Sequence, residues 1–147
     1  MRLVTIIDGD TYMAVDSLGK RRKLRLADVD CPELSQRNGP AARAFVRNLT
    51  RKMWVDVQLR GRDRYARHLA RVRIGGRDLA HALVSAGLAY PLNSGGRFAF
   101  VALGARLARK GIHSGFGQRK PWESRSRSSF IGRWLSRRAY RKKNRRR

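Results

Sequence analysis

Short apolar stretches separated by turn residues predict five β-strands along the chain, and the last three of them alternate apolar and polar residues. Alternation with a period of two places successive side chains on opposite faces of a strand. Residues that favour turns separate the early stretches, as in Asp8-Gly9 and in residues 16–19. The predicted strands are residues 3–7, 11–15, 22–27, 53–59 and 69–74. The first three follow one another through short turns and predict a three-stranded meander.

Apolar residues at helical spacing predict three helices. These helices are residues 41–51, 78–86 and 97–110. Gly39-Pro40 precedes the first, since proline fits the first helical turn, and Gly87 and Gly111 end the other two. One helix after the third strand and two after the fifth predict an α+β fold, built on a five-stranded Greek-key barrel of the OB type. This type of barrel often binds nucleic acids.

Residues 118–147 form a different kind of sequence, in which 13 Lys and Arg stand against one Glu. We therefore predict one folded domain at residues 1–117, large enough to bury its own core, and a basic tail at residues 118–147. The tail contains a partly helical pattern of apolar residues, at Phe130, Ile131, Trp134 and Leu135. Three interpretations of this pattern stay open: a disordered solvated tail, a nucleic-acid-binding helix, and a helix on a membrane surface or a partner protein.

The net charge of the whole chain limits the classes of molecule that it can bind. Thirty-five Lys and Arg against 10 Asp and Glu give a formal net charge of +25. This excess predicts an anionic partner, which is either DNA or RNA or an anionic membrane surface. The single cysteine, Cys31, excludes an internal disulfide, and no apolar run reaches the ~20 residues of a membrane span or forms a signal peptide. We expect a cytoplasmic monomer, and export by a route without such a signal stays open.

Half of the carboxylates lie in two short segments of this very basic chain. They are Asp8, Asp10, Asp28, Asp30 and Glu33. One interpretation is local charge balance against neighbouring arginines. The other is a site for a hard divalent cation, which takes oxygen ligands and would itself face a phosphate. Calcium fits this cluster better than zinc, because the cluster offers oxygen atoms and no histidine at ligand spacing.

An arginine in the third predicted strand points toward the same region. Arg25 lies between Leu24 and Leu26 in an alternating run, so its side chain points to the face opposite theirs. Pro32 lacks an N–H for the sheet and ends the strand. Asp30 therefore lies at a strand end, where binding and catalytic residues are often found.

Five segments in register resemble the signature of the staphylococcal nuclease (thermonuclease) family. They are DGDT at 8–11, RLADVDCPE at 25–33, NGP at 38–40, DRYARHLA at 63–70 and ALVSAGLA at 82–89. Each segment alone is a weak signal, but their common order is specific. The resemblance covers about residues 1–115. It implies an OB-type barrel with three helices and a calcium-dependent phosphodiesterase that acts on DNA and RNA.

The resemblance also implies which residues bind the metal and activate water. The carboxylates of Asp10 and Asp30 and the backbone carbonyl of Cys31 correspond to the calcium ligands. Glu33 corresponds to the general base on the attacking water. A carboxylate within reach of a water molecule can orient it or take its proton, so the residue type agrees with that role.

Basic and aromatic residues correspond to the family's phosphate and nucleotide contacts. Arg25 and Arg67 match two arginines that clamp the phosphate, and Arg64 and Tyr65 match positions that hold the neighbouring nucleotide. Tyr90 adds a second ring. Two planar guanidiniums, each able to donate two parallel N–H bonds, suit the charge that develops on phosphoryl oxygens during attack.

Three positions depart from the family pattern. Cys31 stands where threonine or alanine is common, and its soft sulfur would be a poor calcium ligand. Ala66 replaces a glycine, which would strain the turn if that residue needs a positive φ. Ile112-His113 replaces a Leu-Trp pair at the end of the third helix.

Two other classes of function stay open at this point. One is a non-catalytic OB module that binds nucleic acid through charge and aromatic rings alone. Such modules typically lose the carboxylates or arginines, all of which are present here. The other is a basic scaffold or membrane-active protein in which the tail carries the function.

Overall fold

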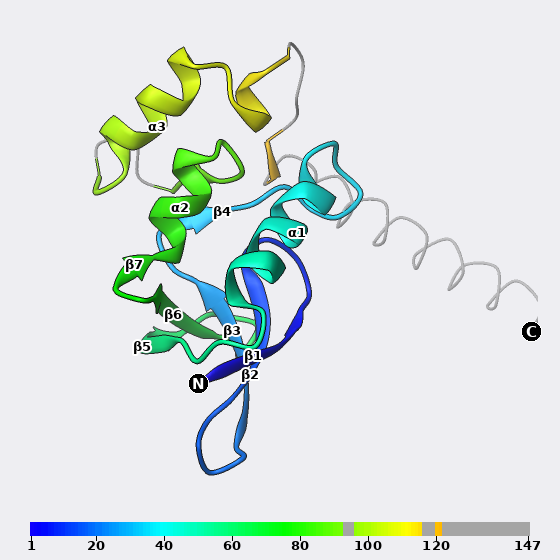
Figure 1. The fold of residues 1–147 in the computed structure, drawn as a ribbon, viewed down its shortest axis with the longest axis vertical. Coiled ribbons are helices and arrows are strands. Elements are labelled where there is room, and N and C mark those ends of the chain that lie inside the picture. The colour runs from blue at the N-terminus through cyan, green and yellow to red at the C-terminus, as the bar shows by residue number, and fades with distance from the viewer. Residues whose placement is uncertain (93–95, 116–119, 122–147) are drawn as a thin grey trace, which may run out of the picture.

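A computed structural model describes residues 1–92, 96–115 and 120–121 (Figure 1). Its strands are β1 (Arg2–Ile6), β2 (Thr11–Val15), β3 (Arg21–Leu26), β4 (Val29–Asp30), β5 (Asp56–Arg62), β6 (His68–Ile74), β7 (Arg77–Asp78) and β8 (Tyr90–Pro91). Its helices are α1 (Gly39–Thr50), α2 (Leu79–Ser85), α3 (Ala99–Leu107) and the 3₁₀ helix Gly111–His113. The predicted α+β class is therefore confirmed. The apolar pattern predicted at residues 130–135 lies outside the described residues.

The main sheet has the strand order β1-β2-β3-β6-β5, and the two-residue strand β7 pairs with β6. The meander β1-β2-β3 is antiparallel, whereas β3 and β6 are parallel. An isolated bridge joins Arg2 to Trp54, and the N–H of Val55 donates to the carbonyl of Met1 at 2.7 Å. The residues just before β5 thus lie beside β1, at the opposite edge of the sheet. Closure into a complete barrel stays a prediction.

The five predicted strands all form, but the count of five is not confirmed, because three two-residue strands are added. These are β4, β7 and β8, and they are too short to show a period in the sequence. The three predicted helices also form within the described residues, with shorter bounds at their C-terminal ends. Asp78, predicted as the first residue of the second helix, is its N-cap and accepts a hydrogen bond from the N–H of His81.

The core lies between the sheet and the helices. Its fully buried side chains include Tyr12, Leu24, Leu26, Val46, Val72, Leu79 and Leu83. Helix α1 packs against β1 and α2, while α2 also packs against β6, and α3 is the outermost helix (Figure 1). Burial of each such leucine side chain contributes about 1.5–3 kcal/mol. The packing fixes the ends of β2 and β3, from which the site described below is built.

None of the helices in the described part of the chain is long and apolar enough to cross a membrane.

Candidate active site

A buried arginine joins two buried carboxylates at the ends of three strands. Arg25 in β3 lies opposite Thr11, so it is beside Asp10 in the turn before β2. Its Nη2 lies 2.5 Å from Oδ1 of Asp30 in β4, and its Nη1 contacts Oδ2 of Asp10. The side chains of Arg25, Asp10 and Asp30 are only 8%, 7% and 3% exposed. The structure therefore brings together three of the residues predicted for the site.

Hydrogen bonds fix the orientation of the Asp10 carboxylate. Its Oδ1 accepts from the Thr11 hydroxyl at 3.1 Å, and its Oδ2 accepts from the N–H of Cys31 at 2.7 Å. Asp8 shapes the turn, because its Oδ1 accepts from the N–H groups of Asp10 and Thr11 at 2.9 and 2.7 Å. A Cβ added at Gly9 would lie 2.7 Å from the Cβ of Cys31, so only glycine fits there.

The charge of Arg25 does not fully offset the effect of burial on Asp10. Burial raises the pKa of Asp10 to about 7; the charge of Arg25 opposes this rise, and the nearby Asp8 adds to it. Nη1 of Arg25 lies against Asp10 without making a hydrogen bond of acceptable geometry. A buried carboxylate with a raised pKa favours an additional positive charge beside it. An additional positive charge beside Asp10 would therefore lower its pKa and favour the charged form.

Arg67 lies at the edge of the same site. It follows β5 in a loop where its Nε and Nη2 bind Oδ2 of Asp63 at 2.8 and 2.7 Å. Its Nη1 donates to the hydroxyl of Thr11 at 3.3 Å, and the same hydroxyl donates to Asp10. Thr11 therefore connects Arg67 to the buried carboxylate of Asp10. The side chain of Arg67 is 19% exposed, which leaves it accessible from solvent.

The loop that carries Arg67 also presents an aromatic ring. Two guanidiniums lie close to the ring of Tyr65, with the Cζ atoms of Arg64 and Arg67 at 5.2 and 5.4 Å from its centroid. Tyr65 itself is 66% exposed. An exposed ring next to positive charge can stack on a base.

Tyr90 and Glu33 both lie near Asp30, Tyr90 in the neighbouring strand and Glu33 three residues further along the chain. Tyr90 in β8 pairs with Asp30 in β4, and its ring meets His113 edge to face with 6.2 Å between centroids. Glu33 begins a tight loop in which its N–H donates to Oε1 of Gln36 at 2.7 Å. A Cβ at Gly39 would lie 1.9 Å from the carbonyl oxygen of Glu33, so that glycine is required for the loop to close.

Comparison with known proteins identifies the family. The model of the staphylococcal nuclease homologue family matches residues 23–99, which span Arg25, Asp30, Glu33 and Arg67. The chain belongs to this family. It is 31% identical over 130 residues to an uncharacterized endonuclease of Escherichia coli, a match that covers 86% of this chain and 84% of that protein.

Two further relatives match over shorter segments. An uncharacterized endonuclease of Haemophilus influenzae is 35% identical over 89 residues, covering 60% of this chain and 50% of that protein. A thermonuclease of Staphylococcus hyicus is 35% identical over 96 residues, covering 60% and 56% of the two chains. The match to this chain thus spans only about half the length of these two relatives.

The structure separates one carboxylate from the predicted cluster. The sequence grouped Asp28 with Asp30, but Asp28 has a φ of 67° and points to a different place, where Arg71 binds it at 3.2 Å. Sequence reasoning also left Asp8, Thr11 and Asp63 without a role. The sequence contained signals for two of these residues. Asp8 precedes Asp10 by two positions, the spacing at which an aspartate accepts a hydrogen bond from a backbone N–H in a turn. Asp63 precedes Arg67 by four positions and binds its guanidinium.

Ala66, where the resemblance to the family implies a glycine, has a φ of 59°, so this turn does require a positive φ. A left-handed backbone costs an L-residue about 1–2 kcal/mol. We expect Ala66→Gly to raise the free energy of unfolding by up to about 1 kcal/mol, since glycine's greater freedom in the unfolded chain offsets part of the gain. Urea denaturation measures this change. As a matched control, Ala44→Gly in α1 should lower the free energy of unfolding by about 0.5–1 kcal/mol. If Ala66→Gly also lowers the free energy of unfolding, the backbone of Ala66 is not strained.

Proposed function

We propose that the chain is a calcium-dependent nuclease that hydrolyses phosphodiester bonds of DNA, RNA or both. The observation that carries this proposal is the convergence of Asp10 and Asp30 on the buried Arg25, with Arg67 joined to Asp10 through the hydroxyl of Thr11. Membership of the family and the names of the relatives, endonuclease and thermonuclease, support the same activity.

The donor atoms fit calcium. Asp10 and Asp30 already share one cationic partner, Arg25, and both offer oxygen, the ligand atom that calcium prefers. Among the described residues, no group of three His, Cys, Asp or Glu side chains is placed to hold a metal. The carbonyl of Cys31 and water molecules would therefore have to complete the six to eight oxygen ligands. When bound, calcium supplies positive charge next to the phosphate and makes a water molecule more acidic.

Residues of the chain would stabilise the charge on the phosphate and accept the proton of the attacking water. The guanidiniums of Arg25 and Arg67 would donate N–H bonds to the phosphoryl oxygens, where negative charge increases as water attacks. For this, Arg25 must release one of the carboxylates, Asp10 or Asp30, that its terminal nitrogens contact in this structure. Glu33 takes the proton of that water as the water oxygen bonds to phosphorus. The bond from phosphorus to the ester oxygen of the leaving nucleotide breaks, and that oxygen takes a proton from solvent, so the products are a phosphate monoester and an alcohol. Because Asp63 holds Arg67 through Nε and Nη2, the guanidinium is oriented before the substrate arrives.

The neighbouring nucleotide would be held by aromatic and basic side chains. Tyr65 offers an exposed face, Arg64 lies against that ring, and Tyr90 adds a second ring beside Asp30. Stacking of a base on an aromatic ring is worth about 1–3 kcal/mol and tolerates any base. This part of the site would therefore provide affinity without strong sequence preference.

A plasmid nicking assay tests the proposal. We expect the full-length protein to nick supercoiled plasmid with calcium, to lose this activity in EDTA, and to show little turnover with magnesium, which demands tighter octahedral geometry and dehydrates reluctantly. Equal turnover with magnesium alone would contradict calcium dependence. Binding without nicking under any of these conditions would favour a non-catalytic module.

A melting experiment provides the control. Calcium at 100 times its Kd should stabilise the folded protein by about 2.7 kcal/mol, because it binds only the folded state. Asp10→Asn should remove this stabilisation, whereas Asp56→Asn, at the start of β5, should retain it. A response to calcium that survives in Asp10→Asn would place the ion elsewhere.

A further inference from the structure

Helix α3 presents apolar side chains to solvent. Phe100, Leu103 and Leu107, here called the apolar stripe, are 90%, 52% and 76% exposed. Their spacing of three and four residues places them on one face of the helix. The opposite face is buried through Phe98 and Ala105. α3 is thus apolar on both faces although it is the outermost helix (Figure 1), where a surface helix normally carries polar residues.

Basic residues adjoin the apolar stripe. Arg106 lies three residues after Leu103, so the two are neighbours on the helix surface, and Arg109 and Lys110 follow the last turn. These three cations, here called the basic border, are all exposed. In the part of the chain that the structure describes, none of the three forms an ion pair. Residues 79–122 contain no Asp or Glu, so α3 lies in a long segment without negative charge.

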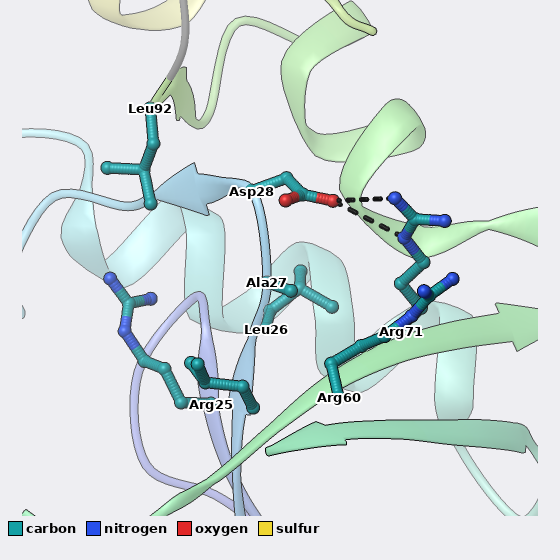
Figure 2. A pocket seen from close by; sticks show the side chains of 8 residues that line it. Arg25, Leu26, Ala27, Asp28, Arg60, Arg71 and Leu92 are labelled. Atoms are coloured by element: carbon teal, nitrogen blue, oxygen red, sulfur yellow. Dashed lines mark hydrogen bonds and ion pairs between the residues drawn. The ribbon is translucent and has the colours of Figure 1, made fainter. Parts of the chain in front are cut away.

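Carboxylates in the adjoining elements have other partners. Asp78, the N-cap of α2, binds Arg97 at 2.9 Å. Asp28, just before β4, binds Arg71 at 3.2 Å, and Figure 2 shows its carboxylate turned toward that arginine. The outer surface of α3 therefore combines apolar side chains with positive charge that no carboxylate of these elements offsets.

We propose that α3 binds the surface of an anionic lipid bilayer, with the apolar stripe inserted among the acyl chains and the basic border against the lipid phosphates. This inference goes beyond the proposed nuclease function and does not rest on it. A helix with Phe and Leu on one face and basic residues beside them lies in the plane of a membrane interface. Its binding strength increases with the apolar area buried and with the attraction of each Lys or Arg to anionic lipid.

Charge favours a bilayer over the other occupants. A second copy of the chain would place two basic borders against each other, because a two-fold interface uses the same surface on both subunits. The tail at residues 118–147, with 13 Lys and Arg against one Glu, would meet the same repulsion. A nucleic acid supplies negative charge but no apolar phase for two leucines.

The size of the apolar stripe also favours a bilayer. Each partner in a standard protein interface buries ~800 Å², which is more than three side chains offer when two of them are partly covered. A bilayer needs no such matched area, because the lipids adapt to the side chains that enter them. Three inserted side chains with adjacent cations suit weak, reversible binding to a membrane surface.

Co-sedimentation of the full-length protein with lipid vesicles tests the proposal. The vesicles contain phosphatidylcholine alone or phosphatidylcholine mixed with anionic phosphatidylglycerol. We expect much stronger binding to the mixed vesicles, because the basic border attracts anionic lipid. Phe100→Ser should lower the partition coefficient on mixed vesicles by about tenfold or more, since it removes an apolar side chain from the membrane.

Leu18→Ser is the matched control. Leu18 is 92% exposed in the turn after β2, at the opposite end of the molecule from α3 (Figure 1). Its replacement should leave the partition coefficient unchanged. Both variants keep the basic tail, so any attraction of the tail to the vesicles cancels in the comparison. Both positions are exposed, and circular dichroism should show that both variants are folded.

Gly104 allows a variant with the opposite expected effect. It lies four residues after Phe100 on the same face, and a Cβ added there would meet nothing within 4 Å outside its own helix backbone and chain neighbours. Gly104→Leu should therefore extend the apolar stripe and raise the partition coefficient several-fold. A helix packed closely on α3 would instead be displaced by this leucine. Weaker vesicle binding by Gly104→Leu would overturn the proposal.

A fluorescent label measures insertion directly. Leu103→Cys gives an exposed thiol for an environment-sensitive dye, whereas Cys31 is buried and protected in the folded protein. The emission of the dye should shift to shorter wavelength when mixed vesicles are added. The same dye on Leu18→Cys should not shift. An unshifted dye at both positions would show that α3 does not enter the bilayer.

Other outcomes would also overturn the proposal. Equal vesicle binding by the native protein and Phe100→Ser would remove the apolar stripe from the contact. Equal binding to both kinds of vesicle would remove the basic border. A concentration-dependent dimer that Phe100→Ser abolishes, measured by analytical ultracentrifugation, would assign the stripe to a second copy. A loss of DNA affinity in Phe100→Ser with unchanged vesicle binding would assign the stripe to nucleic acid.

Discussion

Replacing Arg67 by alanine is expected to lower kcat by ~10³-fold or more, the effect of losing an arginine that stabilises charge on a transferring phosphoryl group. Arg67 is held by Asp63 and remains partly exposed, so its removal should disturb the active site more than the fold. Steady-state cleavage of a short phosphodiester substrate measures the effect. Arg67→Lys should recover only part of the rate, because lysine cannot donate two parallel bonds.

Arg25→Ala should reduce kcat on the same scale but also affect the fold. It leaves Asp10 and Asp30 without the guanidinium that they share, and removing one partner of a buried pair costs about 3–5 kcal/mol. Circular dichroism must therefore show a folded protein before its rate is interpreted. Arg73→Ala, on an exposed position of β6, is the control for loss of charge alone. A loss of less than about tenfold at both Arg25 and Arg67 would favour a non-catalytic binding module.

Removal of the basic tail should have a similarly large effect on binding but not on chemistry. We propose that residues 118–147 form a tether for nucleic acid, separate from the domain at residues 1–117. Pro121 is buried, so the truncation is best made after it, which removes 11 Lys and Arg and one Glu. Each phosphate neutralised adds about 0.9 to the slope of log affinity against log salt. With 6 to 10 contacts, the full-length protein should lose ~10³- to 10⁵-fold in affinity for long duplex DNA between 50 and 200 mM salt.

The truncated protein should bind duplex DNA more weakly and with a much shallower salt slope. It should still cleave a short dinucleotide-like ester at nearly the full-length kcat, because Asp10, Arg25 and Arg67 are untouched. An unchanged salt slope would rule out a nucleic-acid tether and favour a membrane or partner role for the tail. Loss of cleavage of the small ester would instead indicate a role in folding.

Much of the fold follows from periodicity. The strands β3, β5 and β6 each carry an alternating pattern, whereas β1 and β2 are short apolar stretches between turns. The pairing of β2 with β3 then places Asp10 beside Arg25 once the meander is recognised. The strand β4 has only two residues, which is too short to show a period in the sequence. Its pairing with β8 nevertheless places Tyr90 opposite Asp30. The positive φ of Ala66 was predictable for another reason. A left-handed backbone is a local property of a turn, and the resemblance to the family implies a glycine at this position.

The contacts within the site could not be predicted, because they depend on tertiary geometry. Asp28 and Asp30 are two residues apart, but the left-handed backbone at Asp28 sends its carboxylate to Arg71. The same limitation applies to Arg60, whose direction is set by a bulge that depends on how β5 pairs with β6. Residue type predicted the chemistry here, and only the pairing of strands showed which charges share a site.

The buried thiol of Cys31 gives direct experimental access to the interior of the site. Cys31 is the only cysteine of the chain and is 3% exposed, and burial raises the pKa of its thiol well above the ordinary value. The thiolate is the form that reacts with alkylating reagents, so the folded protein should be labelled only when this region opens. Because the N–H of Cys31 donates to Asp10, such an opening also disturbs the carboxylate. The rate of alkylation under native conditions therefore reports how often the region around Asp10 and Cys31 opens by local unfolding. Any ligand that stabilises the closed form of this region will lower the alkylation rate.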